Sequence, residues 1–460
     1  MNKRNQQIDE IEKKWDKLTS TANADASCQV QYVSELEQLF TAVADFMDTS
    51  AAAGDMKMVS NLAAGLVPKM RVLSGSIERM IAATNEMNTN LSAAYDEIYR
   101  LKKYKVDYVA HISAMHYANA GDYILAKSLR KLIEHSRGEI EWESEKVSDP
   151  VTELSLEVYN RSRGLIIGGG GLLLSDSNPN SVSGWQWACP IDLMEKIEVP
   201  IYVLGVGYNR FRGQDEFSQC FTDNLRCLVR KSSIFGLRNY GSIKAVRQYL
   251  PDELAEKVIY HPCATTVISK LYEIPAKQEG CMIGINCAFD RADRRFGGEE
   301  NMNRVIRSLA ETVRNLKNRY HATILCYIHC MQDEVVINVL RKEGVEATPV
   351  NLIGRDEQYM IEWYAKADLV LGMRGHSQMV AYGVGTPAIS LISHDKMRWF
   401  LDDIDHAEWG VEMADEHFGE ILMEKAVYML EHSAQIKHEI EESKEKLWEI
   451  LNANVAKMNL

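Results

Sequence analysis

The sequence predicts an α/β fold in which two Rossmann-like, doubly wound domains face each other across a cleft, preceded by an all-helical N-terminal domain. From about residue 150, short apolar runs rich in β-branched residues alternate with helical patterns. This alternation is typical of buried parallel sheets covered by helices. It restarts after a polar loop near residue 276, which indicates two domains, whereas residues 1–148 show only helical periodicity.

Residues 1–148 are predicted to form a helical bundle or a TPR-like domain. Apolar residues such as Tyr32, Leu36 and Leu39 recur at helical spacing. The segment "HYANAGDYILAKSLRKLIEH" is consistent with one helix–turn–helix unit of the tetratricopeptide type, with "AGDY" as the turn. No second copy follows at a fixed period, so a bundle or helical hairpin for self-association is favoured over a repeat array.

The remaining chain divides into three parts. Residues 149–275 and 276–415 are predicted to be the first and second Rossmann-like domains. Residues 416–460 are predicted to be helices that pack back on the body, because an apolar stripe recurs at helical spacing among Glu and Lys residues. In such sheets a ligand lies beyond the carboxyl ends of the strands, so candidate site residues are sought there.

Composition narrows the class of protein. The net charge of −13 argues against a nucleic-acid partner. No apolar run is long enough for a transmembrane segment, and the N-terminal residues lack an apolar signal core, so we expect a cytoplasmic protein. The nine cysteines are scattered and odd in number, as expected for reduced thiols. We expect no metal site and no bound cofactor.

Glycines follow the first predicted strand of the α/β region. Gly168, Gly169 and Gly170, with Gly171, form a run that matches neither the GxGxxG nor the Walker pattern. Their amides could bind an anion of a substrate, or the run could be a tight strand-to-helix turn.

Four basic residues stand at predicted strand ends. Arg238 follows one strand in "FGLRNYGS", Arg374 and His376 follow another in "GMRGHSQ", and Lys396 follows a third in "LISHDKM". Ser377 lies in the first turn of the helix that begins at His376, where the helix dipole favours an anion. Together these residues predict a cationic site for an anionic substrate. Asp333 also follows a strand, and it could bind sugar hydroxyls or cap the next helix.

The ordered set of these motifs resembles the polysaccharide pyruvyl transferase family over about residues 160–405. The resemblance rests on "GGGGLL", "FGLRNYGS", "YHPCATTV", "YIHCMQDE" and "LVLGMRGHSQMVAYGVGTPAISLISHDK". Asn239, His261 and Gly375 depart from the family pattern, which often has leucine at the last of these positions.

The resemblance implies phosphoenolpyruvate as co-substrate and, as acceptor, a sugar of a surface polysaccharide or of its lipid-linked precursor. The product would be a pyruvate ketal, with release of phosphate. Arg238 and Lys396 would hold the donor's anionic groups, His376 would be the acid and base, and Arg374 would support the site. The glycine amides, Asp176 and Asp333 would line the acceptor side. Peripheral membrane contact would come through a lipid-linked acceptor, and N-terminal helices would mediate homo-oligomer or partner contact.

Two alternatives remain open. A nucleotide-sugar-dependent glycosyltransferase of the GT-B-like architecture also has two facing domains, and glycine loops with arginine or lysine suit a nucleotide diphosphate. The second alternative is a degenerate transferase that acts as an interaction module through its helical N-terminus.

Overall fold

A computed structural model describes residues 107–115, 118–175, 181–211, 213–277 and 279–460, with single residues between 41 and 93. These single residues, such as Thr41 and Thr84, are helical. The rest of the predicted N-terminal domain lies outside the described residues, so its helical bundle and its role in self-association stay predictions. Residues 105–460 form one compact unit, and the fold below is that of the described part of this unit.

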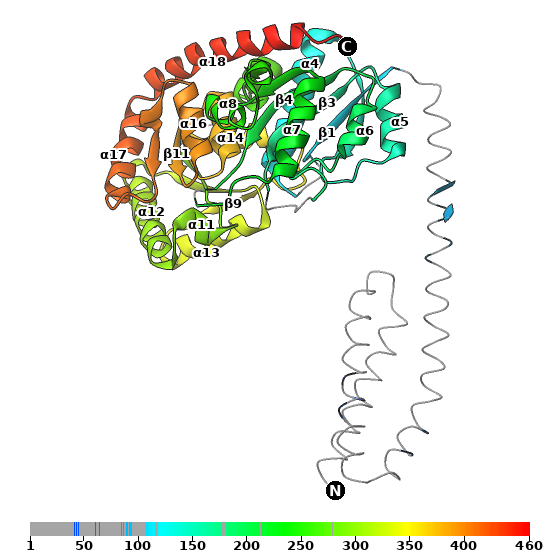
Figure 1. Cartoon of the computed structure of the whole chain (residues 1–460). Coiled ribbons are helices and arrows are strands. Elements are labelled where there is room, and N and C mark those ends of the chain that lie inside the picture. Colours follow the sequence, from blue (N-terminus) through cyan, green and yellow to red (C-terminus); the bar gives the residue numbers. More distant parts are fainter. Residues whose placement is uncertain are drawn as a thin grey trace. The chain divides into compact units, whose positions relative to one another are not determined.

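The first domain is a parallel six-stranded sheet in the order β2-β1-β3-β4-β5-β6 (Figure 1). Every residue of β4, "IYVLGVGY", is buried, because helices cover both faces of the sheet. The elements of this domain, in chain order, are β1 (Tyr108–Ser113), α4 (Ala120–Arg137), β2 (Glu141–Lys146), α5 (Glu153–Arg161), β3 (Leu165–Leu173), α6 (Ile191–Glu195), β4 (Ile201–Tyr208), α7 (Gln219–Lys231), β5 (Ser232–Leu237), α8 (Tyr240–Arg247), α9 (Asp252–Ala255) and β6 (Val258–Tyr260).

The first sheet begins about forty residues before the boundary predicted at 148. β1 and β2 both belong to it, so the helical prediction for residues 107–148 is wrong outside α4. β1 is a short, fully buried run that period alone cannot distinguish from a helix, and β2 is an edge strand of mostly charged residues. The predicted turn "AGDY" is instead the first turn of α4, whose N-cap Asn119 accepts the N–H of Gly121 at 3.0 Å.

The second domain is also a parallel six-stranded sheet, in the order β12-β11-β10-β7-β8-β9. η2 (Ala264–Val267) and α10 (Ile268–Leu271) lead into it from the first sheet. Its elements are β7 (Met282–Asn286), α11 (Ala292–Phe296), α12 (Glu299–Tyr320), β8 (Thr323–Ile328), η3 (Met331–Glu334), α13 (Val335–Lys342), β9 (Thr348–Asn351), α14 (Glu357–Lys366), β10 (Leu369–Gly372), α15 (Gly375–Val384), β11 (Ala388–Ile392), α16 (Asp395–Asp403), η4 (Ala407–Trp409) and β12 (Gly410–Glu412). The predicted fold of two Rossmann-like domains is therefore confirmed.

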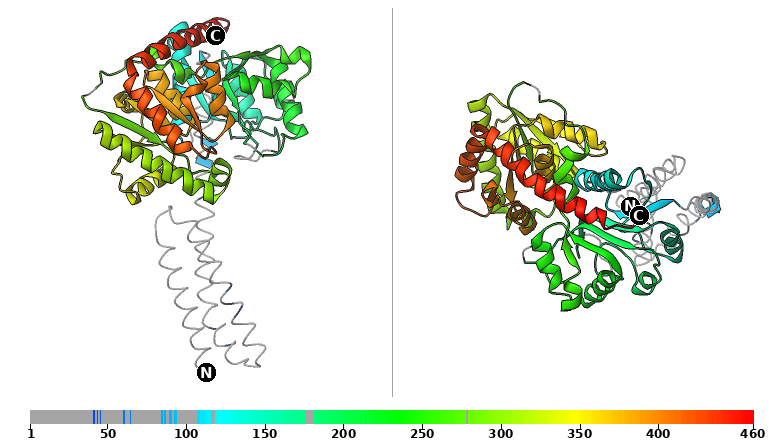
Figure 2. Two further views of the ribbon diagram at one scale, coloured as in Figure 1. Left: turned by 90° about the vertical axis from the view of Figure 1, so that its left-hand side faces the viewer. Right: turned by 90° about the horizontal axis from the view of Figure 1, so that it is seen from above.

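Two C-terminal helices, α17 (Phe418–Glu431) and α18 (Ser433–Ala456), complete the unit. α18 runs from the second domain to the first, as the red helix in Figures 1 and 2 shows. Its stripe of Ile440, Leu447 and Leu451 is buried, and Asn459 beyond its end donates its backbone N–H to the hydroxyl of Tyr202 at 2.9 Å. The two domains are therefore connected by the segment of η2 and α10 and by the C-terminal helix α18. No helix of the described residues is long and apolar enough to cross a membrane.

The glycine run lies inside β3 and does not form the predicted turn before a helix. Gly169 has a φ of +73°, and a Cβ there would stand 3.1 Å from Cγ of Leu125 in α4. Glycine is needed at this position because α4 packs closely over the strand.

Gly169→Ala is expected to lower the free energy of unfolding by about 2 kcal/mol, from left-handed backbone strain and from the contact with Leu125. Urea denaturation of the whole chain measures it. Gly138→Ala is the matched control, because Gly138 has a φ of +82° but nothing within 4 Å of its would-be Cβ. An equal loss in both variants would contradict a role for close packing of α4.

Candidate active site

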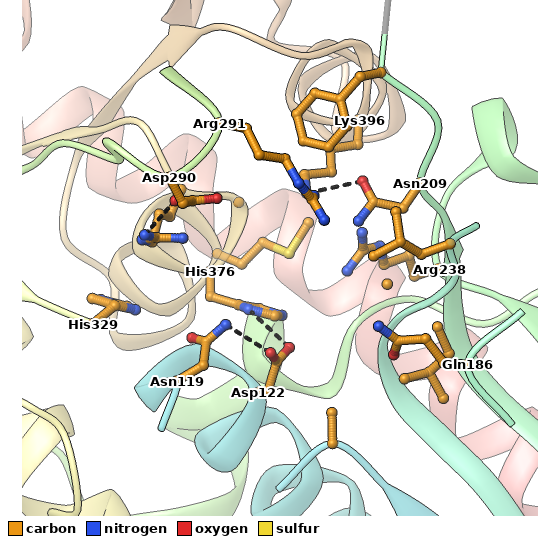
Figure 3. Close-up of a pocket in the computed structure, with 18 of the residues that line it drawn as sticks. Asn119, Asp122, Gln186, Asn209, Arg238, Asp290, Arg291, His329, His376 and Lys396 are labelled. Carbon is orange, nitrogen blue, oxygen red and sulfur yellow. Dashed lines mark hydrogen bonds and ion pairs between the residues drawn. The ribbon is translucent and has the colours of Figure 1, made fainter. Parts of the chain in front are cut away.

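A cavity of about 420 Å³ lies where the carboxyl ends of strands from both sheets meet. Residues at or after the ends of β1, β3, β4 and β5 line it from the first domain, and residues that follow β7, β8, β10 and β11 line it from the second. Figure 3 shows side chains of both domains pointing into this cavity. The lining residues include Asn119, Asp122, Gly171, Gln186, Asn209, Phe211, Arg238, Asp290, Arg291, Arg295, His329, Arg374, Gly375, His376 and Lys396.

Arg238 enters the cavity directly after β5. Its guanidinium lies against the backbone of Gly207 in β4, where a side chain would collide with it. The Arg238 residue is 6% exposed, and its Nε has no hydrogen-bond partner among the described residues. Burial lowers the pKa of Arg238, and the opposing charges of Cys263 and Asp122 do not outweigh it. An anionic ligand would supply the missing partner.

Lys396 approaches the same cavity from the first turn of α16. Its Nζ donates to Oδ1 of Asn209 at 3.1 Å, a hydrogen bond that joins the two domains. Burial, and then the nearby guanidinium groups of Arg238 and Arg295, lower the pKa of Lys396 well below its ordinary value. Like Arg238, Lys396 makes no ion pair within 4 Å with a described carboxylate, so an anion that bound here would favour its charged form.

Arg374 is held by two carboxylates. Its Nε donates to both oxygens of Asp333 at 3.1 and 2.9 Å, and its Nη2 donates at 2.6 Å to Asp333 and at 2.6 Å to Asp290. Burial lowers the pKa of Arg374, but the hydrogen bonds and charge of Asp333 outweigh this effect and raise it. Arg374 is therefore charged and held in place by two carboxylates, whereas Arg238 and Lys396 make no ion pair with a described carboxylate.

Asp333 does not line the cavity, which corrects its prediction as a sugar ligand. Its side chain is 0% exposed. Besides Arg374, its Oδ2 accepts the backbone N–H groups of His329 at 3.0 Å and Cys330 at 3.2 Å, and Nδ2 of Asn286 at 3.1 Å. Asp333 thus orients Arg374 from behind the cavity and caps the turn after β8.

His376 lies in the first turn of α15 with its ring against α4. A Cβ at Gly121 would stand 2.6 Å from its Nδ1, so only glycine fits there. Its Nε2 has no hydrogen-bond partner among the described residues. Burial first, and then the positive charge of Arg238, lower the pKa of His376 well below 6.5. The imidazole is therefore neutral in the free protein at neutral pH.

Several other predicted residues lie away from the cavity. Gly168 and Gly169 serve the packing of β3 against β4 and α4, and Gly170 has a φ of +127°; of the glycine run only Gly171 lines the cavity. Ser377 is buried, and its Oγ accepts the hydroxyl of Tyr364 at 3.1 Å. Asp176 lies outside the described residues. Gly375 lines the cavity, and nothing lies within 4 Å of its would-be Cβ, so it leaves open space there.

Sequence analysis missed several cavity residues with charge or hydrogen-bonding capacity, and four of them are Asn119, Asp122, Asp290 and Arg295. Asn119 and Asp122 lie on the segment that was predicted to belong to the helical N-terminal domain. Asp290 and Arg295 lie in the loop and helix that follow β7, a strand end at which the sequence reasoning named no polar residue. Burial opposes ionisation of Asp290, but Arg295 and Arg374 together outweigh it and lower its pKa. The signal that could have found all four is their position just after β1 or β7.

Comparison with known proteins places these residues in a family context. The family model for polysaccharide pyruvyl transferases matches residues 119–395. No curated protein matches the chain.

Several solved structures have a similar chain trace. The UDP-GlcNAc 2-epimerase of Neisseria meningitidis bound to UDP-GlcNAc is 12% identical, with 75% of this chain and 98% of that chain covered and a TM-score of 0.43. S. aureus MnaA with UDP is 12% identical, with coverages of 77% and 98% and a TM-score of 0.46. Acinetobacter baumannii MurG is 10% identical, with coverages of 76% and 100% and a TM-score of 0.41.

Proposed function

Because the chain belongs to the polysaccharide pyruvyl transferase family, we propose that it transfers the enolpyruvyl group of phosphoenolpyruvate to a sugar and forms a pyruvate ketal. The observation that carries the proposal is the shortage of negative charge in the cavity. Arg238 and Lys396 have no carboxylate partner within ion-pair distance among the described residues, and burial lowers the pKa of both groups. Phosphoenolpyruvate carries a phosphate and a carboxylate, which suit these two cations.

The proposed chemistry needs one group that both gives and takes a proton. His376 gives a proton to the methylene carbon C3, and the cationic C2 is attacked by a first acceptor hydroxyl, whose proton returns to His376. Phosphate then leaves with the electron pair of its C2–O bond. A second hydroxyl attacks C2, and its proton goes to the phosphate. The donor's negative charge favours the imidazolium that starts the sequence.

The acceptor is proposed to be a sugar of a surface polysaccharide or its lipid-linked precursor. Gly375 supports a roomy acceptor side, because it leaves open space where family members often carry leucine. A cytoplasmic location is part of the proposal, and it is supported by the free state of all eight cysteines among the described residues.

Phosphoenolpyruvate is expected to stabilise the protein against heat, whereas UDP-GlcNAc is not. At a hundredfold excess over Kd, a ligand adds about 2.7 kcal/mol to the free energy of unfolding. Arg238→Met should abolish the shift in Tm, because the variant lacks the donor's partner. Arg307→Met, an exposed arginine of α12, is the matched control and should keep the shift.

The same protein is then incubated with phosphoenolpyruvate and a panel of p-nitrophenyl glycosides. Ketal formation raises the mass of the acceptor by that of pyruvic acid less one water, and it releases one phosphate per product. Mass spectrometry and a phosphate assay measure these two changes. Stabilisation by UDP-GlcNAc alone would instead favour the nucleotide-sugar glycosyltransferase. A chain that binds neither ligand would favour the interaction module.

A further inference from the structure

Asp122 has a carboxylate oxygen beside the ring of His376. Its Oδ1 lies 3.9 Å from Nδ1 of His376, and no other carboxylate of the described residues lies within 4 Å of that ring. Nδ2 of Asn119 donates to Oδ2 of Asp122 at 2.7 Å. Asn119 is itself fixed, since its Oδ1 caps α4 through the N–H of Gly121. Figure 3 shows this chain from Asn119 to Asp122 to His376.

The approach of the two segments is close enough to fix the ring. The first turn of α4 carries Gly121, and the absence of a side chain there admits the imidazole. The carboxylate therefore meets the Nδ1 edge of the ring, while Nε2 keeps no partner among the described residues. The separation of 3.9 Å is an ion-pair distance and not a hydrogen bond, so in the free protein the carboxylate faces Nδ1 without a hydrogen bond to it. This arrangement suits a general acid and base, because one nitrogen faces a carboxylate and the other is left for a substrate.

Cations surround the pair from several elements. Arg238 follows β5, Arg374 precedes α15 and Lys396 lies in α16, and all three cations oppose a positive charge on His376. His329, which follows β8, also interacts with His376, but burial lowers the pKa of His329 to about 4, so its ring is neutral at neutral pH. Burial lowers the pKa of His376 and raises that of Asp122. Both shifts disfavour the charged form of the group concerned in the free protein. Within the described part of the chain, Asp122 is thus the carboxylate placed to balance an imidazolium at this position.

We propose that Asp122 is a positioning residue for His376, which orients the imidazole through Nδ1 and balances its charge while Nε2 gives a proton to the donor. This inference rests on the proposed function and extends it. In the step concerned the Nε2–H bond breaks and the C3–H bond of the pyruvyl group forms. The proton of the first acceptor hydroxyl then restores the Nε2–H bond, and Asp122 neither gains nor loses a proton overall.

Asp122→Asn tests the role in turnover. We expect kcat to fall about 100-fold with the KM for phosphoenolpyruvate within about threefold, because the donor's cations remain. The alkaline limb of the pH profile of kcat is expected to move to lower pH by about one unit, since loss of a negative charge disfavours the imidazolium. Asp223→Asn, an exposed carboxylate of α7, is the matched control and should change neither quantity.

A second measurement does not depend on turnover. In protein labelled with ¹⁵N-histidine, with His376→Gln to assign the signal, Nδ1 of the neutral imidazole should carry the proton in the wild type. Asp122→Ala should move that proton to Nε2. A wild-type ring protonated at Nε2, or wild-type kcat and an unmoved pH limb in Asp122→Asn, would overturn the proposal. If no acceptor is converted, the proposed function fails. The position of the proton on the neutral ring of His376 still decides, independently of turnover, whether Asp122 orients that ring.

Discussion

His376→Gln is expected to reduce ketal formation about 1,000-fold while leaving phosphoenolpyruvate binding within about fivefold of the wild type. General acid–base groups contribute factors of about 10² to 10⁴, and His376 lines the cavity near the charge of Arg238 with its Nε2 unpartnered among the described residues. Binding survives because Arg238 and Lys396 supply the charge for the donor. Turnover is followed by phosphate release, and binding by titration calorimetry.

Glutamine is preferred to alanine at this position because the ring of His376 fills the space above Gly121. A smaller side chain would leave a void against α4, and a loss of stability would then confuse the result. His438→Gln on α18 is the matched control, since that imidazole is 74% exposed. Near-normal ketal formation by His376→Gln with an unchanged Tm would remove the histidine from the proposed mechanism.

The strand-end cations of the site could be predicted from the sequence because their positions follow a topological rule. In a parallel sheet the carboxyl ends of all strands meet at one edge, so Arg238, Arg374, His376 and Lys396 were expected together before any distance was known. The structure brings all four to one cavity. The sequence could not show that these cations differ in their partners. Arg374 is fixed by two carboxylates, whereas Arg238 and Lys396 have none within ion-pair distance among the described residues.

Asp122 could not be found in the same way because the strand before it was not recognised. β1 is only six residues long, and the strong helical pattern of α4 begins at Ala120, a short loop later. Because the domain boundary was predicted at residue 148, Asp122 was assigned to the helical N-terminal domain and not to the α/β domains that form the site. For Asp333 the position after β8 was predicted correctly, but the direction in which its side chain points was not. A side chain after a strand can face the cavity or turn behind it, and only packing decides.

Asp333→Asn is expected to lower the free energy of unfolding by about 3–5 kcal/mol. An amide has one acceptor oxygen, whereas the carboxylate of Asp333 accepts from Arg374, two backbone N–H groups and Asn286. In either orientation the NH₂ group faces a donor, and the buried guanidinium loses its main counter-charge. Guanidinium chloride denaturation of the whole chain measures the loss.

The structure also predicts which changes should be milder. Asp290→Asn removes a carboxylate that is 32% exposed and leaves Arg374 its bonds to Asp333. It also removes the ion pair of the buried Arg295 at 3.0 Å, so we expect a loss of about 2 kcal/mol. The double variant Asp333→Asn with Arg374→Met should regain part of the stability lost in the single variant, because the buried charge goes with its partner. A loss below about 1 kcal/mol for Asp333→Asn would mean that Arg374 is not anchored from behind the cavity. Its guanidinium would then be available to the substrate together with that of Arg238 and the ammonium of Lys396.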